Sequence, residues 1–194
     1  MLGKDYSDQD CSLARALEVV GERWTLLIVR DAFYGVRRFS DFHAHLDIPR
    51  AVLTDRLTGL VEDGLMERVS DPEHAGRQLY LLTRRGRELW PVLHGMMMWG
   101  ARGSAGNSRI FGHAACGSEL DDRGWCPSCQ LIPAPEDIIT RPKPGRKPRR
   151  DDPVALALRS PHRLLEPLDV SRPERGASDT IPAESRVKAR AQGR

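Results

Sequence analysis

Four residues with metal-binding side chains lie close together in the stretch HAACGSELDDRGWCPSC. They are His113, Cys116, Cys126 and Cys129, and they form two pairs with two residues between the members of each pair. Structural zinc takes four nitrogen or sulfur ligands in a tetrahedron, and pairs at this spacing can hold the ion from two sides. The segment is too short to form a core, so a metal would supply its missing folding energy. The sequence predicts a structural Zn²⁺ site at these residues.

Another interpretation of this segment stays open, in which the residues are reduced thiols without a metal. A catalytic zinc is less favoured, because four candidate ligands leave no open coordination position for a substrate. No motif places a catalytic base beside the cysteines, so we expect no enzymatic activity. In a reducing compartment, such cysteines are more often ligands or reactive thiols than disulfides.

A second candidate site is a helix expected over residues 50–62. Leu53, Leu57, Leu60 and Val61 repeat every three or four positions, which predicts one buried stripe. The opposite face carries small or short polar side chains, as a helix must if it is to approach base edges in a DNA major groove. The residues expected to contact DNA on this helix, before it and on the following hairpin are Arg37, Arg38, Ser40, Arg50, Ala51, Thr54, Asp55, Arg56, Thr58 and Arg77. Periodicity alone leaves other uses of two helices joined by a turn open.

The elements that position these residues follow from caps and periodicity. Ser12 is the expected cap of a helix over residues 13–20, which Gly21 would end in a left-handed conformation. A central helix over residues 23–34 is followed by a short one over 41–46, expected to be capped by Ser40. The remaining predicted elements are the helix over residues 50–62, a hairpin from strands at 65–70 and 77–83, and a helix over 84–101 capped by Thr83 and bent at Pro91.

This order predicts a mainly α fold with a small β-hairpin, a winged helix-turn-helix. We divide the chain into an N-terminal arm (1–10), a winged helix for DNA binding and dimerisation (11–108), a zinc-ribbon-like segment (111–139) and a basic, proline-rich tail (140–194). The tail has no sustained hydrophobic period and is therefore expected to be disordered.

Composition narrows the class of protein. The chain has 194 residues, 40% of them hydrophobic, and a net charge of +3. Acidic and basic residues balance through residue 110, and the basic excess lies after residue 141. No apolar stretch is long enough for a membrane helix, and the N-terminus lacks the apolar region of a signal peptide. We therefore expect a cytoplasmic protein.

Several linked motifs follow one another between Cys11 and about Ser108. In order, they are CSLARALEVVGERWTLLIVRDAFYGVRRFSDF, IPRAVLTDRLTGLVEDGLMERV, YLLTRRGRELWPVL and MWG. In order and spacing they resemble the HxlR-type winged-helix transcriptional regulators. The resemblance implies binding to double-stranded DNA, a homodimer formed by the first and last helices, and a two-fold symmetric operator. It also makes Cys11 a possible redox sensor; the alternative is a small buried residue at the start of a packed helix.

The chain departs from this family in two places. Pro49 stands where the family has a serine that caps the recognition helix, and the wing carries EHAGRQ where a Pro-Pro pair is common. Two alternative functions remain: a zinc- or thiol-dependent redox sensor or enzyme, and a winged-helix adaptor for another protein. An adaptor is expected to replace Arg37, Arg38 and Arg50 with apolar residues. The sequence specifies no effector.

Overall fold

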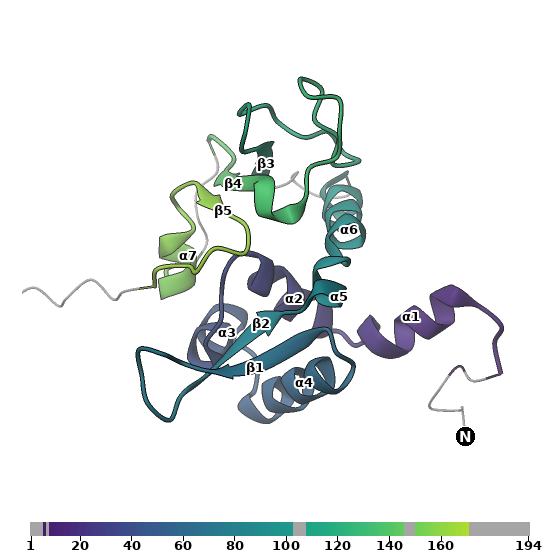
Figure 1. The fold of residues 1–194 in the computed structure, drawn as a ribbon, viewed down its shortest axis with the longest axis vertical. Coiled ribbons are helices and arrows are strands. Elements are labelled where there is room, and N and C mark those ends of the chain that lie inside the picture. The colour runs from purple at the N-terminus through teal and green to yellow at the C-terminus, as the bar shows by residue number, and fades with distance from the viewer. Residues whose placement is uncertain (1–5, 7, 103–107, 146–149, 171–194) are drawn as a thin grey trace, which may run out of the picture.

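The computed structural model describes residue 6 and residues 8–102, 108–145 and 150–170 (Figure 1). Its helices are α1 (Ser12–Val20), α2 (Thr25–Phe33), α3 (Phe39–Leu46), α4 (Arg50–Glu62), α5 (Arg84–Arg87), α6 (Trp90–Arg102) and α7 (Pro153–Ala157), with a 3-10 turn, η1 (Pro135–Asp137). Its strands are β1 (Met66–Ser70), β2 (Gln78–Leu82), β3 (Arg109–His113), β4 (Ile138–Pro142) and β5 (His162–Arg163).

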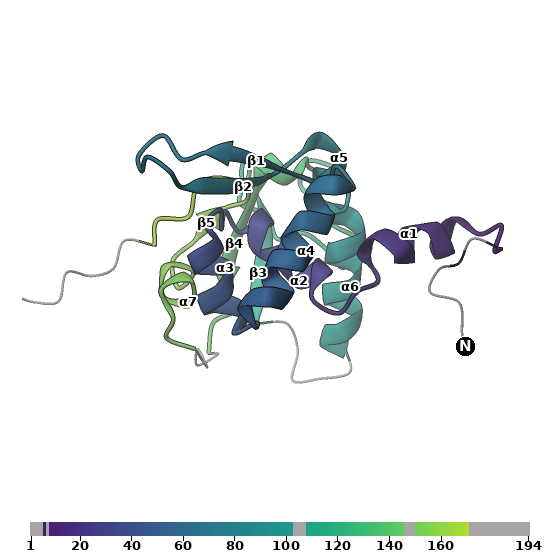
Figure 2. The same ribbon diagram turned by 90° about the horizontal axis from the view of Figure 1, so that it is seen from below.

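The first sheet is the predicted hairpin. β1 and β2 pair antiparallel, with Met66 opposite Leu82. The backbone before α3 adds a short third pairing, because Arg38 bridges Leu79. Helices α3 and α4 lie side by side next to this hairpin, and its turn extends away from them (Figure 2). The arrangement confirms the predicted fold class, a mainly helical chain containing a winged helix-turn-helix.

The second sheet contains β3, β4 and β5 in that order, all antiparallel. It shares one hydrophobic core with the winged helix. The Trp90 ring of α6 packs against Phe33 of α2 at 5.2 Å between centroids and against Phe111 of β3 at 5.3 Å. Because one buried ring contacts both parts, the two sheets belong to a single folded unit.

The predicted cap Thr83 is confirmed. The Thr83 hydroxyl accepts a hydrogen bond from the Gly86 N–H at 3.1 Å and so caps α5. Gly35 and Gly64, which follow α2 and α4, have φ values of +84° and +69°. In this left-handed region glycine avoids the steric cost that a side chain brings.

The other predicted ends are wrong. α1 and α3 have Cys11 and Arg38 as their N-caps, without a side-chain cap, and the predicted caps Ser12 and Ser40 lie inside the helices. Each helix begins at or before the predicted cap, so the serine takes part in helical backbone hydrogen bonding instead. Gly21 keeps a right-handed conformation, with φ −72°, rather than a left-handed one.

The predicted helix over residues 84–101 is divided into α5 and α6. Pro91 is the second residue of α6. A proline in the first turn of a helix loses no hydrogen bond, because the N–H groups there have no partner within the helix. The chain therefore begins a new helix beside Pro91 instead of bending an old one.

The disorder predicted for residues 140–194 is wrong for the part that the structure describes. Thr140 and Val154 are completely buried, and Asp152 caps α7 by accepting the Ala155 N–H at 3.0 Å. The apolar residues of this stretch follow no regular period, yet Val154, Leu158 and Leu164 all enter the common core. Residues 146–149 and 171–194 lie outside the described residues.

Helix α1 extends away from the rest of the molecule in both views (Figures 1 and 2). Ala14 is its one buried residue, and Leu13 is 66% exposed. Of the predicted N-terminal arm, only Tyr6 and residues 8–10 are described. No helix in the described ranges has the length and apolar character needed to cross a membrane.

Candidate nucleic-acid interface and metal centre

Helix α4 has one buried face and one exposed face, as predicted. The residues at most 2% exposed are Leu53, Leu57 and Leu60. The exposed residues are Arg50, Ala51, Thr54, Asp55 and Thr58. The helix follows Pro49, whose backbone provides the N-cap without a side-chain hydrogen bond. No side chain replaces the capping serine that the family has in place of Pro49.

Two details of α4 affect what its exposed face can offer. The Thr54 hydroxyl donates to the Arg50 carbonyl at 3.0 Å, so its methyl group and oxygen lone pairs remain available outside the helix. Arg56 is half-buried, and its guanidinium lies 3.6 Å from the Glu22 carboxylate. Arg56 is therefore directed toward the turn before α2, whereas Thr54 remains on the exposed face.

The two arginines before α3 are engaged inside the protein. Arg37 donates to the Leu165 carbonyl at 2.9 Å, and burial, followed by the nearby Arg87 guanidinium, lowers its pKa. Arg38 lies 3.3 Å from the Asp71 carboxylate and 3.2 Å from that of Glu73. Both arginines are half-buried. In this arrangement they hold the C-terminal segment and the base of the wing, and neither presents a free guanidinium.

The wing base is organised around Asp71, which is 5% exposed. Burial alone would raise the pKa of Asp71, but the Glu73 N–H at 2.9 Å and the Arg38 guanidinium outweigh it and hold the pKa below its usual value. His74 also contacts Asp71, at 3.2 Å. Asp71, Glu73 and His74 lie close enough to ligate a metal. Since the Arg38 guanidinium already contacts all three, an ion-pair cluster explains this group.

Arg77 is exposed at the end of the hairpin turn. The backbone N–H of Arg77 donates to the His74 carbonyl at 3.1 Å, which closes the turn. Gly76, the residue before it, has φ +79°. Ser40 is exposed near the start of α3, where its hydroxyl donates to Asp41. Of the predicted phosphate-contacting arginines, Arg50 and Arg77 are the two that are exposed.

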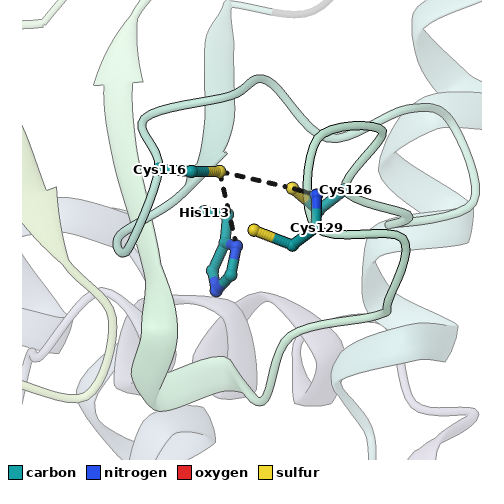
Figure 3. A group of neighbouring side chains, drawn as sticks. All are labelled: His113, Cys116, Cys126 and Cys129. Atoms are coloured by element: carbon teal, nitrogen blue, oxygen red, sulfur yellow. Dashed lines mark hydrogen bonds between the residues drawn. The ribbon is translucent and has the colours of Figure 1, made fainter.

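The four predicted metal ligands come together in space (Figure 3). One ligand atom of each of His113, Cys116, Cys126 and Cys129 lies within 4.8 Å of the other three. The Cys116 sulfur is 3.4 Å from the Cys126 sulfur and 3.5 Å from His113 Nδ1. A zinc–sulfur bond of about 2.3 Å in a tetrahedron requires ligand separations of about 3.8 Å, which this spacing matches. The group could therefore bind a metal ion.

Two similar backbone turns position these side chains. The His113 carbonyl accepts the Gly117 N–H, and the Cys126 carbonyl accepts the Gln130 N–H, each at 2.8 Å. Gly117 and Gln130 have positive φ values of 72° and 55°. Each turn thus brings the second ligand of its pair back over the first.

The sulfur environments differ. Burial raises the pKa of Cys126, but the Cys129 N–H and hydrogen bonds with Cys116 and His113 outweigh it and lower the pKa to about 7. The hydrogen bond with Cys116, followed by burial, raises the pKa of Cys129 to about 11. His113 and Cys126 are buried, whereas Cys116 and Cys129 are exposed. A divalent cation would favour the thiolate forms of all three cysteines.

Cys11 is exposed at the start of α1, so the alternative of a small buried residue is wrong. Sequence reasoning also missed the C-terminal contacts. The Leu165 N–H donates to the Phe33 carbonyl at 2.8 Å, and the Leu168 N–H donates to the Gly35 carbonyl at 3.1 Å. The glycine after α2 was the available signal, since a backbone that approaches so closely leaves no room for a side chain.

Comparison with known proteins places this arrangement in a family. Residues 19–106 match the family model described as HxlR-like helix-turn-helix. An HTH-type transcriptional regulator of Mycobacterium tuberculosis is 44% identical over 142 residues, which are 70% of this chain and 88% of that protein. The HTH-type transcriptional regulator YdeP of Bacillus subtilis is 31% identical over 105 residues, 52% of this chain and 82% of that protein.

Solved structures also match. A protein from Pseudomonas aeruginosa described as a transcription factor is 40% identical, with a TM-score of 0.41, over 57% of this chain and 77% of that one. The family is assigned from sequence, because the chain covers 88% of the mycobacterial regulator at 44% identity. The chain belongs to the HxlR-like family of helix-turn-helix transcriptional regulators.

Proposed function

We propose that this protein is a dimeric regulator that binds a two-fold symmetric DNA operator and reads its major groove with α4. The observation that carries the proposal is the exposed face of α4, where small and short polar side chains lie above a fully buried stripe. A helix with this profile can approach base edges closely. We propose Ala51, Thr54, Asp55 and Thr58 as the residues nearest the bases.

Affinity requires cations that face phosphates. Arg50 at the start of α4 and Arg77 on the wing are exposed, so we propose them as phosphate contacts. Arg37 and Arg38 support the site from inside, through Leu165 and Asp71. An adaptor for another protein would be expected to show an apolar face here. The exposed face of α4 carries no apolar side chain larger than that of Ala51. We propose no enzymatic activity and a cytoplasmic location, where operator DNA is found.

The test uses operators selected from random duplexes and binding measured over a range of salt. Thr54→Ala should relax discrimination at one or two positions per half-site, because a lost base contact costs about 1–3 kcal/mol. Arg77→Ala should weaken binding to all sequences and reduce the salt slope by about one unit. Arg123→Ala removes the same charge from the ribbon segment and serves as the control. Unchanged discrimination with Thr54→Ala, together with equal salt slopes for both arginine variants, would contradict the proposal.

Dimerisation is supported by apolar side chains that their own chain leaves exposed. They lie on α1 and α6, the first helix and the last helix of the winged-helix region: Leu13, Leu17, Val92, Met96 and Trp99. Two other apolar residues of α6, Trp90 and Leu93, pack inside the monomer. Exposed apolar groups of this number favour a partner surface.

We further propose that the metal is Zn²⁺ with a structural role. The donor set of one imidazole and three thiols is typical of zinc, and four ligands leave no open position for catalysis. Purified protein should contain about one zinc per chain, and Cys126→Ser combined with Cys129→Ser should remove it. Cys11→Ser is the matched control and should keep the metal. Freshly prepared protein without zinc, purified in the absence of chelators, would show that the thiols are metal-free.

A further inference from the structure

A cleft of about 600 Å³ lies between the winged helix and the ribbon segment. One wall comes from the hairpin, α5 and the start of α6. The other wall is the segment after Cys129 that leads through η1 into β4. The volume falls within the range of small-molecule sites, about 300–1,000 Å³. The HxlR-like match ends at residue 106, so the wall formed by the segment after Cys129 lies outside the family model.

The walls of the cleft are largely apolar and rigid. Leu82 and Trp90 are buried at its base, and Pro91, Pro133 and Pro135 line it. Ile132 also lines it and is 59% exposed, although Ile138 a few residues later is completely buried. An isoleucine held open to solvent beside three prolines gives a fixed apolar surface that a ligand can cover without rearranging the backbone.

The charged residues of the cleft are not balanced. Arg87 pairs with Glu136 at 2.8 Å across the cleft, and Arg84 lies 3.9 Å from Glu88. These two pairs leave the carboxylate of Glu67, on β1, without an ion-pair partner among the described residues. A partner for this cleft should therefore combine apolar area with one positive charge.

We propose that this cleft is a binding site for a hydrophobic organic cation. Its apolar groups would pack against Ile132 and the prolines, and its charge would lie near Glu67. The ligand would contact β1, α5 and the start of α6 on one side and the segment after Cys129 on the other. Such a ligand would act as an effector of DNA binding; that role depends on the proposed function, whereas binding itself does not.

The test compares two ions of the same shape and opposite charge on the full chain. Tetraphenylphosphonium and tetraphenylborate are titrated by calorimetry, and the cation should bind once per chain and at least about tenfold more tightly, a difference of about 1.4 kcal/mol. Equal binding of both ions, or no binding of the cation at millimolar concentration, would overturn the proposal.

Two variants locate the site. Glu67→Gln should weaken tetraphenylphosphonium binding about threefold to fivefold, the effect of removing one partly exposed charge. Glu62→Gln removes an equal charge from the end of α4, outside the cleft, and should leave binding unchanged. Ile132→Ser should weaken binding through lost apolar contact. Both cleft positions are exposed, so circular dichroism should show a native fold in each variant.

Equal effects of Glu67→Gln and Glu62→Gln would overturn the location. Operator binding is measured separately on the same preparations. Cation binding without operator binding would reject the proposed function and keep the site, and operator binding without cation binding would do the reverse.

Discussion

Gly35 joins the end of α2 to the C-terminal segment, and its lack of a side chain is required for this contact. Its φ is +84°, and a Cβ atom there would overlap the Glu166 carbonyl oxygen. The Leu168 N–H donates to the Gly35 carbonyl from the same segment. Any side chain at position 35 must therefore push away the residues that hold Arg37.

We predict that Gly35→Ala destabilises the protein more than a change of backbone conformation alone explains. A left-handed conformation costs a residue with a side chain about 1–2 kcal/mol, and the displaced segment adds to that. Gly76→Ala is the control, because Gly76 has φ +79° with open space around it. Urea unfolding should give the larger loss for Gly35→Ala. Equal losses for the two variants would mean that the segment moves aside without cost.

At the scale of helices and strands, local sequence patterns predicted much of the fold. The positions of Leu53, Leu57 and Leu60 alone indicated which face of α4 is buried, because that face follows the helical repeat. The two β-rich stretches separated by DPEHAG indicated the hairpin. The His/Cys spacing likewise predicted the group that the structure brings together, since each pair lies within one short turn. All of these features depend on neighbours in sequence.

The features that sequence reasoning missed depend on distant contacts. α7 is five residues long and has no amphipathic repeat, and its order comes from packing Val154 against a core formed mainly by earlier residues. Arg37 was expected to face DNA, because nothing near it in the sequence indicates its hydrogen-bond partner. Its guanidinium donates to the carbonyl of Leu165, 128 residues later. Arg38 is similar, since its carboxylate partners Asp71 and Glu73 lie in the hairpin turn, 33 and 35 residues later.

Helix α7 is attached to α3 through Asp152, and this attachment gives a pH-dependent prediction. Asp152 Oδ1 lies 2.9 Å from His45 Nδ1 and also accepts the Ala155 N–H. Burial alone would raise the pKa of Asp152, but these hydrogen bonds outweigh it and hold the pKa below its usual value. The ionised carboxylate therefore stabilises the fold above about pH 4, and this contribution is lost as the pH falls through the lower folded value.

Asp152→Asn should lower the free energy of unfolding by about 0.5–2 kcal/mol at pH 7, because the cap is kept and the charge is lost. The difference from the unaltered protein should shrink below about pH 4. Urea unfolding at pH 7 and pH 3 measures both values, and Asp151→Asn, at an exposed neighbour, is the control. A difference that stays constant over this range would mean that the carboxylate charge contributes nothing.

Across the whole molecule, the shared core connects the metal group to the winged helix. Phe111, two residues before His113, packs at 5.3 Å against Trp90 and at 5.5 Å against His94. Ile138 and Leu164 extend the same cluster. If zinc supplies folding energy to the ribbon, that energy also supports α6.

Removing the metal with a chelator should therefore lower the unfolding temperature of the entire chain in one transition, because ligand binding to the folded state stabilises it. Far-ultraviolet circular dichroism, dominated by the winged-helix helices, and tryptophan fluorescence should report the same midpoint. A ribbon that melts separately, with the helical signal unchanged by chelation, would show that the two parts are energetically independent.

Helices α1 and α6 determine the expected assembly. α1 extends from the body and has Leu13 exposed, while α6 exposes Trp99 at 77%. Burying apolar area contributes about 25 cal/mol per Å², so these side chains favour contact with a second copy over contact with water. Light scattering at micromolar concentration should give twice the chain mass of 21.8 kDa.

Trp99→Asp should shift the mass toward the monomer, because a charge buried without a partner in the interface is costly. Ile132→Asp introduces the same charge at an exposed apolar residue outside these helices and should leave the dimer intact. A monomeric mass for the unaltered protein, or equal loss of the dimer in both variants, would contradict an interface formed by α1 and α6.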